Sequence, residues 1–270
     1  MDVAFIDCHC HISALEFVED LDDVIKRTKE ANVKALVAVT EYASDFERVI
    51  QLSKNYPDLV LPCFGIHPVQ GTGQDRRSAN IQDLEPVLPL FQKYRNDIIA
   101  VGEIGLDFTP WCAPTVQERE EQLMIFRRQL EVSKELALPV NVHSRSAAKV
   151  TIGTMKELGI RDALLHNFAG KPSVALEAVR AGYCLSFPPV ISTNQQRVKL
   201  IRQIPLENIC LETDCPALGP EKNVRNEPKN ITLSCEHIAR VKGIPSEMVA
   251  DVTTQNALRL FPKLKRILKP

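Results

Sequence analysis

Short apolar runs recur along the whole chain, and an amphipathic stretch follows most of them. Val, Ile and Leu dominate these runs with little polar alternation, as expected of strands that are buried on both faces of a parallel sheet. The pattern predicts strands at 4–7, 35–40, 60–65, 98–103, 139–143, 163–166, 182–187 and 208–212.

The segments between these runs have helical patterns. Segment 21–31 places Leu21, Val24 and Ile25 on one face with charges opposite. Thr115 and Glu118 have capping-box spacing before a long predicted helix, and segment 44–47 repeats that form. Strands alternating with helices, without a glycine-rich dinucleotide turn, predict an α/β protein with a (β/α)8 TIM barrel. No linker or repeat interrupts the pattern, so residues 1–270 are expected to form one domain.

Chemistry in such barrels sits at the carboxyl ends of the strands, so polar residues that end an apolar run are the candidates. The first run ends in His9 and His11. Alternate residues of a strand share a face, so these two imidazoles point the same way and can hold one divalent ion. A hydrogen-bonded histidine pair is the alternative for this motif taken alone.

Four further polar residues end other runs: Glu103, His143, His166 and Asp214. An isolated carboxylate at such a position has a large desolvation cost, which a cation removes. Together with the first two histidines they make six ligands, too many for one tetrahedral ion. We therefore predict two adjacent divalent metal ions, with Glu103 as the natural bridge. The imidazole count favours Zn²⁺ or another first-row transition metal, and Mg²⁺ and Mn²⁺ remain alternatives.

Composition narrows the function classes. The net charge is −1, so a protein that coats duplex nucleic acid is disfavoured, whereas an enzyme that engages a few phosphates is permitted. The eight cysteines lie mostly in apolar, strand-like segments, where free thiols behave as small hydrophobes. No leader or membrane-spanning run is recognisable. We expect an intracellular, cytoplasmic protein with nuclear access left open, no membrane contact and no stable protein partner.

The ordered motifs resemble the successive signatures of the TatD-type deoxyribonucleases, within the metallo-dependent hydrolase superfamily. The likeness covers essentially the whole chain, as far as the C-terminal segment Asn256-Ala257-Leu258-Arg259-Leu260-Phe261. The matching motifs are Asp7-Cys8-His9-Cys10-His11, Gly65-Ile66-His67-Pro68, Gly102-Glu103-Ile104-Gly105-Leu106-Asp107, His143-Ser144-Arg145, His166-Asn167-Phe168, Leu211-Glu212-Thr213-Asp214 and Arg225-Asn226-Glu227-Pro228.

The resemblance implies that Glu103 is shared by two metal sites. His9 and His11 complete the first site, and His143 and His166 complete the second. Asp214 then binds a metal or its water. Three residues depart from the family pattern near these ligands, although no expected ligand is missing: Cys10, Asn167 and Cys215.

The hypothesis for function is two-metal hydrolysis of DNA phosphodiester bonds, as an exonuclease or at abasic sites. The predicted partner is DNA, contacted over a short stretch at a single strand, a strand end or an abasic site. Asp214 is assigned to orient the attacking water and accept its proton, with Glu103 between the metals. His67 polarises the phosphate or protonates the leaving oxygen, and a structural loop histidine is the alternative.

The predicted substrate contacts are Arg145, Arg225 and Asn226. For Arg145 a salt bridge is the alternative, and for Arg225 the alternative is loop stabilisation. Two carboxyl groups near the predicted ligands stay unassigned between a supporting and a purely structural role: Asp107 and Glu212.

Two further residues have structural expectations. His237 is expected at the surface of a helix, and Trp111 is expected as a packed loop anchor rather than as a platform for a base.

Two other function classes remain. One is a dinuclear metal hydrolase of a small-molecule ester or amide. In many such enzymes a carboxylated lysine bridges the metals, and Glu103 in that place favours the nuclease branch. The other is a non-catalytic metal-bound scaffold, which the complete ligand set disfavours.

Overall fold

Eight parallel strands form one sheet at the centre of the computed structural model, which describes residues 4–190 and 195–266. Each strand overlaps a predicted run, and its ends lie within two residues of that run except in β1, which extends three residues further, so the strand predictions are confirmed. In their order around the sheet the strands are β1 (Phe5–Cys10), β2 (Val33–Val39), β3 (Val60–Phe64), β6 (Ala100–Gly105), β7 (Val140–His143), β8 (Ala163–Leu165), β9 (Cys184–Phe187) and β10 (Ile209–Leu211).

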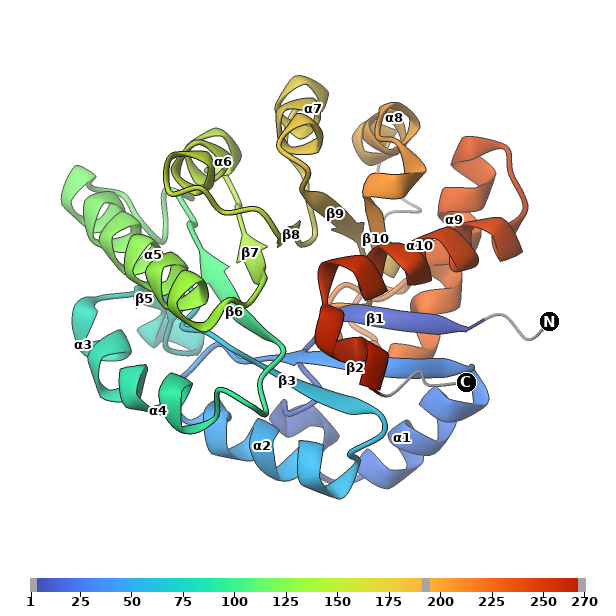
Figure 1. Ribbon diagram of the computed structural model, residues 1–270, viewed down its shortest axis with the longest axis horizontal. Helices are drawn as coiled ribbons and strands as arrows, with labels where there is room; N and C mark the ends of the chain where they lie inside the picture. The colour runs from blue at the N-terminus through green and yellow to red at the C-terminus, as the bar shows by residue number, and fades with distance from the viewer. Residues whose placement is uncertain (1–3, 191–194, 267–270) are drawn as a thin grey trace.

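The two edges of this sheet meet, which makes it a barrel. The residues just after β10 bond to β1: the amide of Asp214 donates to the carbonyl of His9 at 3.0 Å, and the amide of His11 donates to the carbonyl of Cys215 at 2.8 Å. The Asp7 carboxylate accepts from the amide of Thr213 at 3.0 Å and closes the same seam. The predicted (β/α)8 barrel is confirmed, with the helices around the outside of the strands (Figure 1).

The helices follow the strands along the chain (Figure 1). They are α1 (Leu21–Glu30), α2 (Asp45–Asn55), α3 (Ile81–Leu84), α4 (Leu88–Lys93), α5 (Val116–Leu136), α6 (Ala148–Glu157), α7 (Pro172–Arg180), α8 (Gln195–Gln203), α9 (Ile231–Lys242) and α10 (Ser246–Leu260). A short antiparallel hairpin of β4 (Val69–Gln70) and β5 (Arg77–Ser78) lies after β3, in a segment where no strand was predicted.

One of the two predicted capping boxes forms. The Thr115 hydroxyl accepts from the amide of Glu118 at 3.2 Å, and the Glu118 carboxylate accepts from the amide of Thr115 at 2.9 Å. The prediction for segment 44–47 is wrong, because Ser44 makes no side-chain cap bond. Asp45 instead accepts from the amides of Glu41 and Tyr42, which fixes the loop between β2 and α2.

The barrel interior is filled at its amino-terminal end, so the free space lies at the other end. Inward-facing residues such as Ile6, Val37 and Leu61 pack there with Leu260 and Phe261 at the end of α10. All eight cysteines are buried free thiols, as predicted. Across the described residues, no helix combines the length and apolar character that a bilayer span requires.

Candidate metal centre

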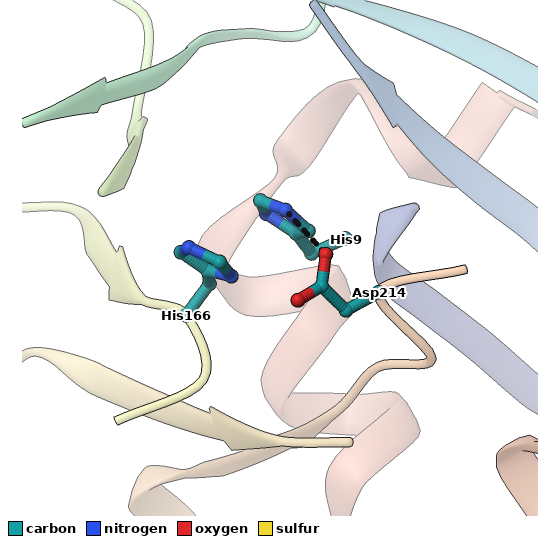
Figure 2. A group of neighbouring side chains, drawn as sticks. All are labelled: His9, His166 and Asp214. Atoms are coloured by element: carbon teal, nitrogen blue, oxygen red, sulfur yellow. Dashed lines mark ion pairs between the residues drawn. The ribbon is translucent and has the colours of Figure 1, made fainter. Parts of the chain in front are cut away.

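The six predicted metal ligands converge at the carboxyl ends of the strands. His9 lies on β1, Glu103 on β6 and His143 on β7. His11 and His166 directly follow β1 and β8, and Asp214 lies three residues after β10. Figure 2 shows His9, His166 and Asp214 pointing toward one another, although they come from three separate parts of the chain. The His9 and His166 rings stack with their centroids 3.7 Å apart.

Glu103 stands between two pairs of histidines and presents one carboxylate oxygen to each. Its Oε2 atom lies 3.5 Å from Nε2 of His9 and 3.6 Å from Nε2 of His11. Its Oε1 atom lies 2.7 Å from Nε2 of His166 and 2.9 Å from Nδ1 of His143. These are the same two sets of residues that the family resemblance implies.

Asp214 contacts the first pair and lies close to His166 as well. Its Oδ1 atom lies 3.2 Å from Nε2 of His11 and 3.5 Å from Nε2 of His9, the contact drawn in Figure 2. The backbone of Asp214 is in the left-handed region, with φ of 54°, and its amide is held by β1. The carboxylate is therefore fixed at the rim of the cluster, where it also lines the cavity.

His67 also reaches the cluster, from the loop after β3. Its Nε2 atom lies 3.3 Å from Oε1 of Glu103 and 3.3 Å from Nδ1 of His143. Its Nδ1 atom lies 3.0 Å from the amide nitrogen of Val69 and 3.1 Å from the carbonyl oxygen of the same residue. The amide donates to an unprotonated Nδ1 and the carbonyl accepts from a protonated one, so these contacts hold the ring in either tautomer. In both, Nε2 faces the cluster.

Asn141 fixes the His9 ring, a role that the sequence reasoning missed. The Asn141 amide donates to the carbonyl of Cys8 at 2.8 Å, which leaves its Oδ1 atom 2.8 Å from Nδ1 of His9. Nδ1 therefore carries the proton, and the lone pair of Nε2 faces the cluster. A usable signal existed, because Asn141 shares a strand face with His143.

Asp107 fixes the ring of His143, as Asn141 fixes the ring of His9. Its Oδ2 atom lies 3.1 Å from Nε2 of His143, so Nδ1 of that ring is left for the cluster. Its Oδ1 atom accepts from the amide of Thr109 at 3.0 Å. Burial works against ionisation, but the hydrogen bonds from His143 and Thr109 lower the pKa of Asp107 to about 2. Asp107 therefore both orients the histidine and holds the following segment.

Glu212 anchors the loop that carries His166. It accepts from the hydroxyl of Ser186 at 2.7 Å and from the amide of Asn167 at 2.8 Å. Its Oε2 atom is 3.7 Å from Nδ1 of His166, beyond hydrogen-bond distance. Burial, partly offset by His9, raises the pKa of Glu212 to about 8.

The protonation states of the carboxyl groups and of His166 in the cluster favour the binding of cations. Burial opposes the ionisation of Glu103, but the nearby histidines hold the pKa of this carboxyl well below its usual range. Asp214 is likewise held below its usual pKa by His11 and His9, against the effect of burial. Burial and the charge of His9 lower the pKa of His166 to about 4, so that ring is neutral at pH 7 and can bind a metal ion through a nitrogen lone pair.

The donor set can therefore hold divalent metal. Three overlapping groups have all their ligand atoms within 4.8 Å of one another: His9 with His166 and Asp214, His9 with His11 and Glu103, and His67 with Glu103 and His143. Two buried carboxylates surrounded by imidazoles need compensating positive charge, and metal ions supply it without the protons that the histidines otherwise carry. Nitrogen and oxygen donors together suit Zn²⁺ and its first-row neighbours.

A cavity of about 1570 Å³ opens above the cluster and is lined by His11, His67, Glu103, His143, His166 and Asp214 among others. Arg145 also lines it, with a 55% exposed side chain whose Nε atom lies 3.1 Å from Oδ2 of Asp107. Glu41, at the wall beside His11, was missed by the sequence reasoning. It follows the second predicted strand directly, so the strand-end rule could have found it.

The predicted substrate contacts Arg225 and Asn226 do not line this cavity. The Arg225 guanidinium pairs with both oxygens of Asp20 at 2.6 and 2.7 Å and with Glu227 at 3.2 Å. Asn226 is fully buried and donates to the carbonyls of Thr213 and Ala217. Both side chains hold the loop after β10, which is the alternative weighed for Arg225, so we no longer assign them to the substrate.

Two minor expectations are wrong. His237 is 7% exposed on α9, so it is not a surface residue. Trp111 is 51% exposed, so it is not a packed anchor, and it does not line the cavity.

Comparison with known proteins identifies the family. Residues 6–262 match the model of the family described as TatD related DNase. The chain is 72% identical to a putative deoxyribonuclease of Danio rerio, over 97% of this chain and 98% of the relative. It is 55% identical to a deoxyribonuclease of Homo sapiens, over 99% and 98%.

A solved structure gives the same result for the fold. The crystal structure of a TatD homologue from Escherichia coli K12 covers 97% of this chain and 99% of its own, with a TM-score of 0.85 and 26% identity. The chain thus belongs to the TatD related DNase family and is a hydrolase that acts on ester bonds.

Proposed function

We propose that this hydrolase cuts DNA phosphodiester bonds, as an exonuclease or at abasic sites, with two divalent metal ions of which Zn²⁺ is favoured. The observation that carries the proposal is the position of Glu103, whose two oxygens face separate pairs of histidines. The human relative is named a deoxyribonuclease, which supports DNA as the substrate.

In this proposal Glu103 bridges the two ions. His9 and His11 hold one ion, and His143 and His166 hold the other. When bound, such a pair supplies Lewis-acid charge that polarises the phosphate and brings the pKa of water to roughly 7. Asn141 and Asp107 keep the proper ring nitrogen of His9 and His143 turned to the ions.

Asp214 and His67 move the protons. Asp214 is ionised because its pKa is held low by His11 and His9, and it lines the cavity, so it can orient the attacking water and accept its proton. His67 turns Nε2 toward the cluster, so with its proton on this atom it can donate to the phosphate or to the leaving oxygen. Arg145, whose side chain lines the cavity, donates a hydrogen bond to a phosphate oxygen.

The test is an assay on end-labelled single-stranded and duplex DNA oligonucleotides, with and without an abasic site. The protein is purified without chelator and compared with Glu103→Ala prepared in the same way. Cleavage by the wild type that is abolished in Glu103→Ala supports the proposal, and the product ladder shows which DNA feature is cut. Hydrolysis of small esters, with no cleavage of any DNA, contradicts it and favours the small-molecule alternative.

A further inference from the structure

The charged side chains on the cavity wall are distributed unevenly. Beyond the metal cluster, the acidic residues among the described lining residues all lie in or just after the loops that follow β1 and β2: Glu16, Glu41 and Asp45. Four basic residues lie together on the side formed by the segments after β7, β8 and β9: Arg145, Lys149, Lys171 and Arg197. Arg48 on α2 and Arg76 just before β5 also line the cavity, so the other side carries charges of both signs. The chain as a whole has a net charge of −1, so this basic side is a local feature.

Three neighbouring helices carry this basic side. Lys149 lies in the first turn of α6, Lys171 is the residue just before α7, and Arg197 lies in the first turn of α8. Contacts join α6 to α7 and α7 to α8, and the three helices follow one another around the barrel (Figure 1). The three basic residues lie at the amino-terminal ends of these helices and therefore on the same rim.

Lys149 and Lys171 have no internal role that explains them. Both are exposed, and within the described residues neither makes an ion pair or a side-chain hydrogen bond. Arg197 is half-buried and donates to Oδ1 of Asn167 at 2.6 Å, beside the ligand His166. The basic side therefore begins next to the metal centre and continues outward through two exposed ammonium groups.

We propose that Lys149 and Lys171, which continue outward from Arg197, form a phosphate track that binds backbone phosphates of a single DNA strand next to the scissile one. This inference rests on the proposed function. The strand leaves the metal centre over α6, α7 and α8 because the charged residues that line the cavity on that side are all basic, whereas the opposite side carries charges of both signs. The track sets affinity and its salt dependence, whereas the metal centre performs the chemistry.

The expected effect follows from counterion release. Each phosphate contact on a single strand adds about 0.7 to the slope of log affinity against log salt. In 0.1 M salt, loss of one contact therefore weakens binding roughly fivefold, and loss of two contacts weakens it roughly 25-fold. Lys149 and Lys171 give the cleaner test, because Arg197 also holds Asn167.

The experiment compares Lys149→Gln, Lys171→Gln and the double variant with the wild type, each loaded with metal. Lys29→Gln is the matched control. Lys29 is exposed in the last turn of α1, at the opposite end of the barrel, and within the described residues it has no ion pair. The substrates are a single-stranded oligodeoxynucleotide and bis(p-nitrophenyl) phosphate, a diester without flanking phosphates. KM and kcat are measured from 50 to 300 mM NaCl.

The proposal predicts that KM for the oligonucleotide rises roughly fivefold in each single variant, and that its salt slope falls by about 0.7 per lysine removed. In the same variants kcat/KM falls for the oligonucleotide relative to the small diester. Lys29→Gln behaves as the wild type on both substrates. An unchanged KM in the double variant, an equal loss on both substrates, or the same change in Lys29→Gln overturns the track. Absence of DNA cleavage in the wild type contradicts the proposed function instead.

Discussion

Replacement of Asn141 by Leu removes the group that fixes the His9 tautomer while keeping a side chain of similar size. Asn141 is fully buried and makes two hydrogen bonds of 2.8 Å, one with Nδ1 of His9 and one with the carbonyl of Cys8. After the change, both partners stay buried without a hydrogen bond. The ring of His9 is then free to place its proton on either nitrogen.

Two magnitudes follow from these contacts. Each of the two buried partners left unsatisfied costs about 1–3 kcal/mol, so the free energy of unfolding of the metal-free protein falls by about 2–6 kcal/mol. Loss of an outer partner of a metal-binding histidine weakens metal affinity by roughly 10- to 100-fold. The second effect requires that His9 is a ligand.

The assay measures the zinc dissociation constant by competition with a chromophoric chelator, and stability by urea unfolding in EDTA. The matched control is Asn256→Leu. Asn256 is also buried and donates to the carbonyls of Leu206 and Ile209 at 2.8 and 2.7 Å, but it lies on α10 outside the metal cluster. Both variants lose stability, and only Asn141→Leu loses zinc affinity. Zinc dissociation constants within twofold of each other in the two variants refute the tautomer argument.

Three other changes have defined outcomes. Asp214→Asn lowers kcat on DNA by roughly 10²- to 10⁴-fold because it removes the proton acceptor, and a kcat equal to the wild type shows that another group accepts the proton. Gly105→Ala lowers the free energy of unfolding by at least about 2 kcal/mol, because φ is 141° and the new Cβ would lie 2.0 Å from the carbonyl oxygen of His143. The control is Gly243→Ala, which has a φ of 67° and no atom within 4 Å of the new Cβ, and which costs about 1 kcal/mol. Equal urea midpoints for the two variants contradict the packing argument. Removal of metal with EDTA lowers Tm, because each ion present at 100 times its dissociation constant adds about 2.7 kcal/mol to the free energy of unfolding. A Tm that does not depend on metal contradicts a site built into the fold.

The barrel could be predicted because its signal is local and repeated. Val, Ile and Leu dominate most of the buried strands, and a polar ligand such as Glu103 or His143 ends the run where the barrel rim begins. The hairpin of β4 and β5 has no such signal, since each strand has two residues and is set by the loop geometry. Ser44 has the spacing of a helix cap, but its neighbour Asp45 reaches the backbone amides first.

The residues that support the ligands were harder to predict because their partners are remote. Asn141 acts on His9 from 132 positions away, and no spacing rule connects the two. Arg225 was assigned to phosphate from its place in a long loop, whereas its partner Asp20 lies 205 positions earlier. Whether an arginine binds a substrate phosphate or pairs with an internal carboxylate depends on which charged groups the fold places beside it.

Titration of the metal-free protein with Zn²⁺, followed by a count of bound metal by mass spectrometry, tests the central claim that Glu103 bridges two ions. The comparison is with Glu103→Ala, checked for folding by circular dichroism. The account predicts about two ions for each wild-type chain and weakened binding of both in Glu103→Ala, since each carboxylate oxygen faces its own pair of histidines. One ion in the wild type, or one ion held by Glu103→Ala at wild-type affinity, contradicts it.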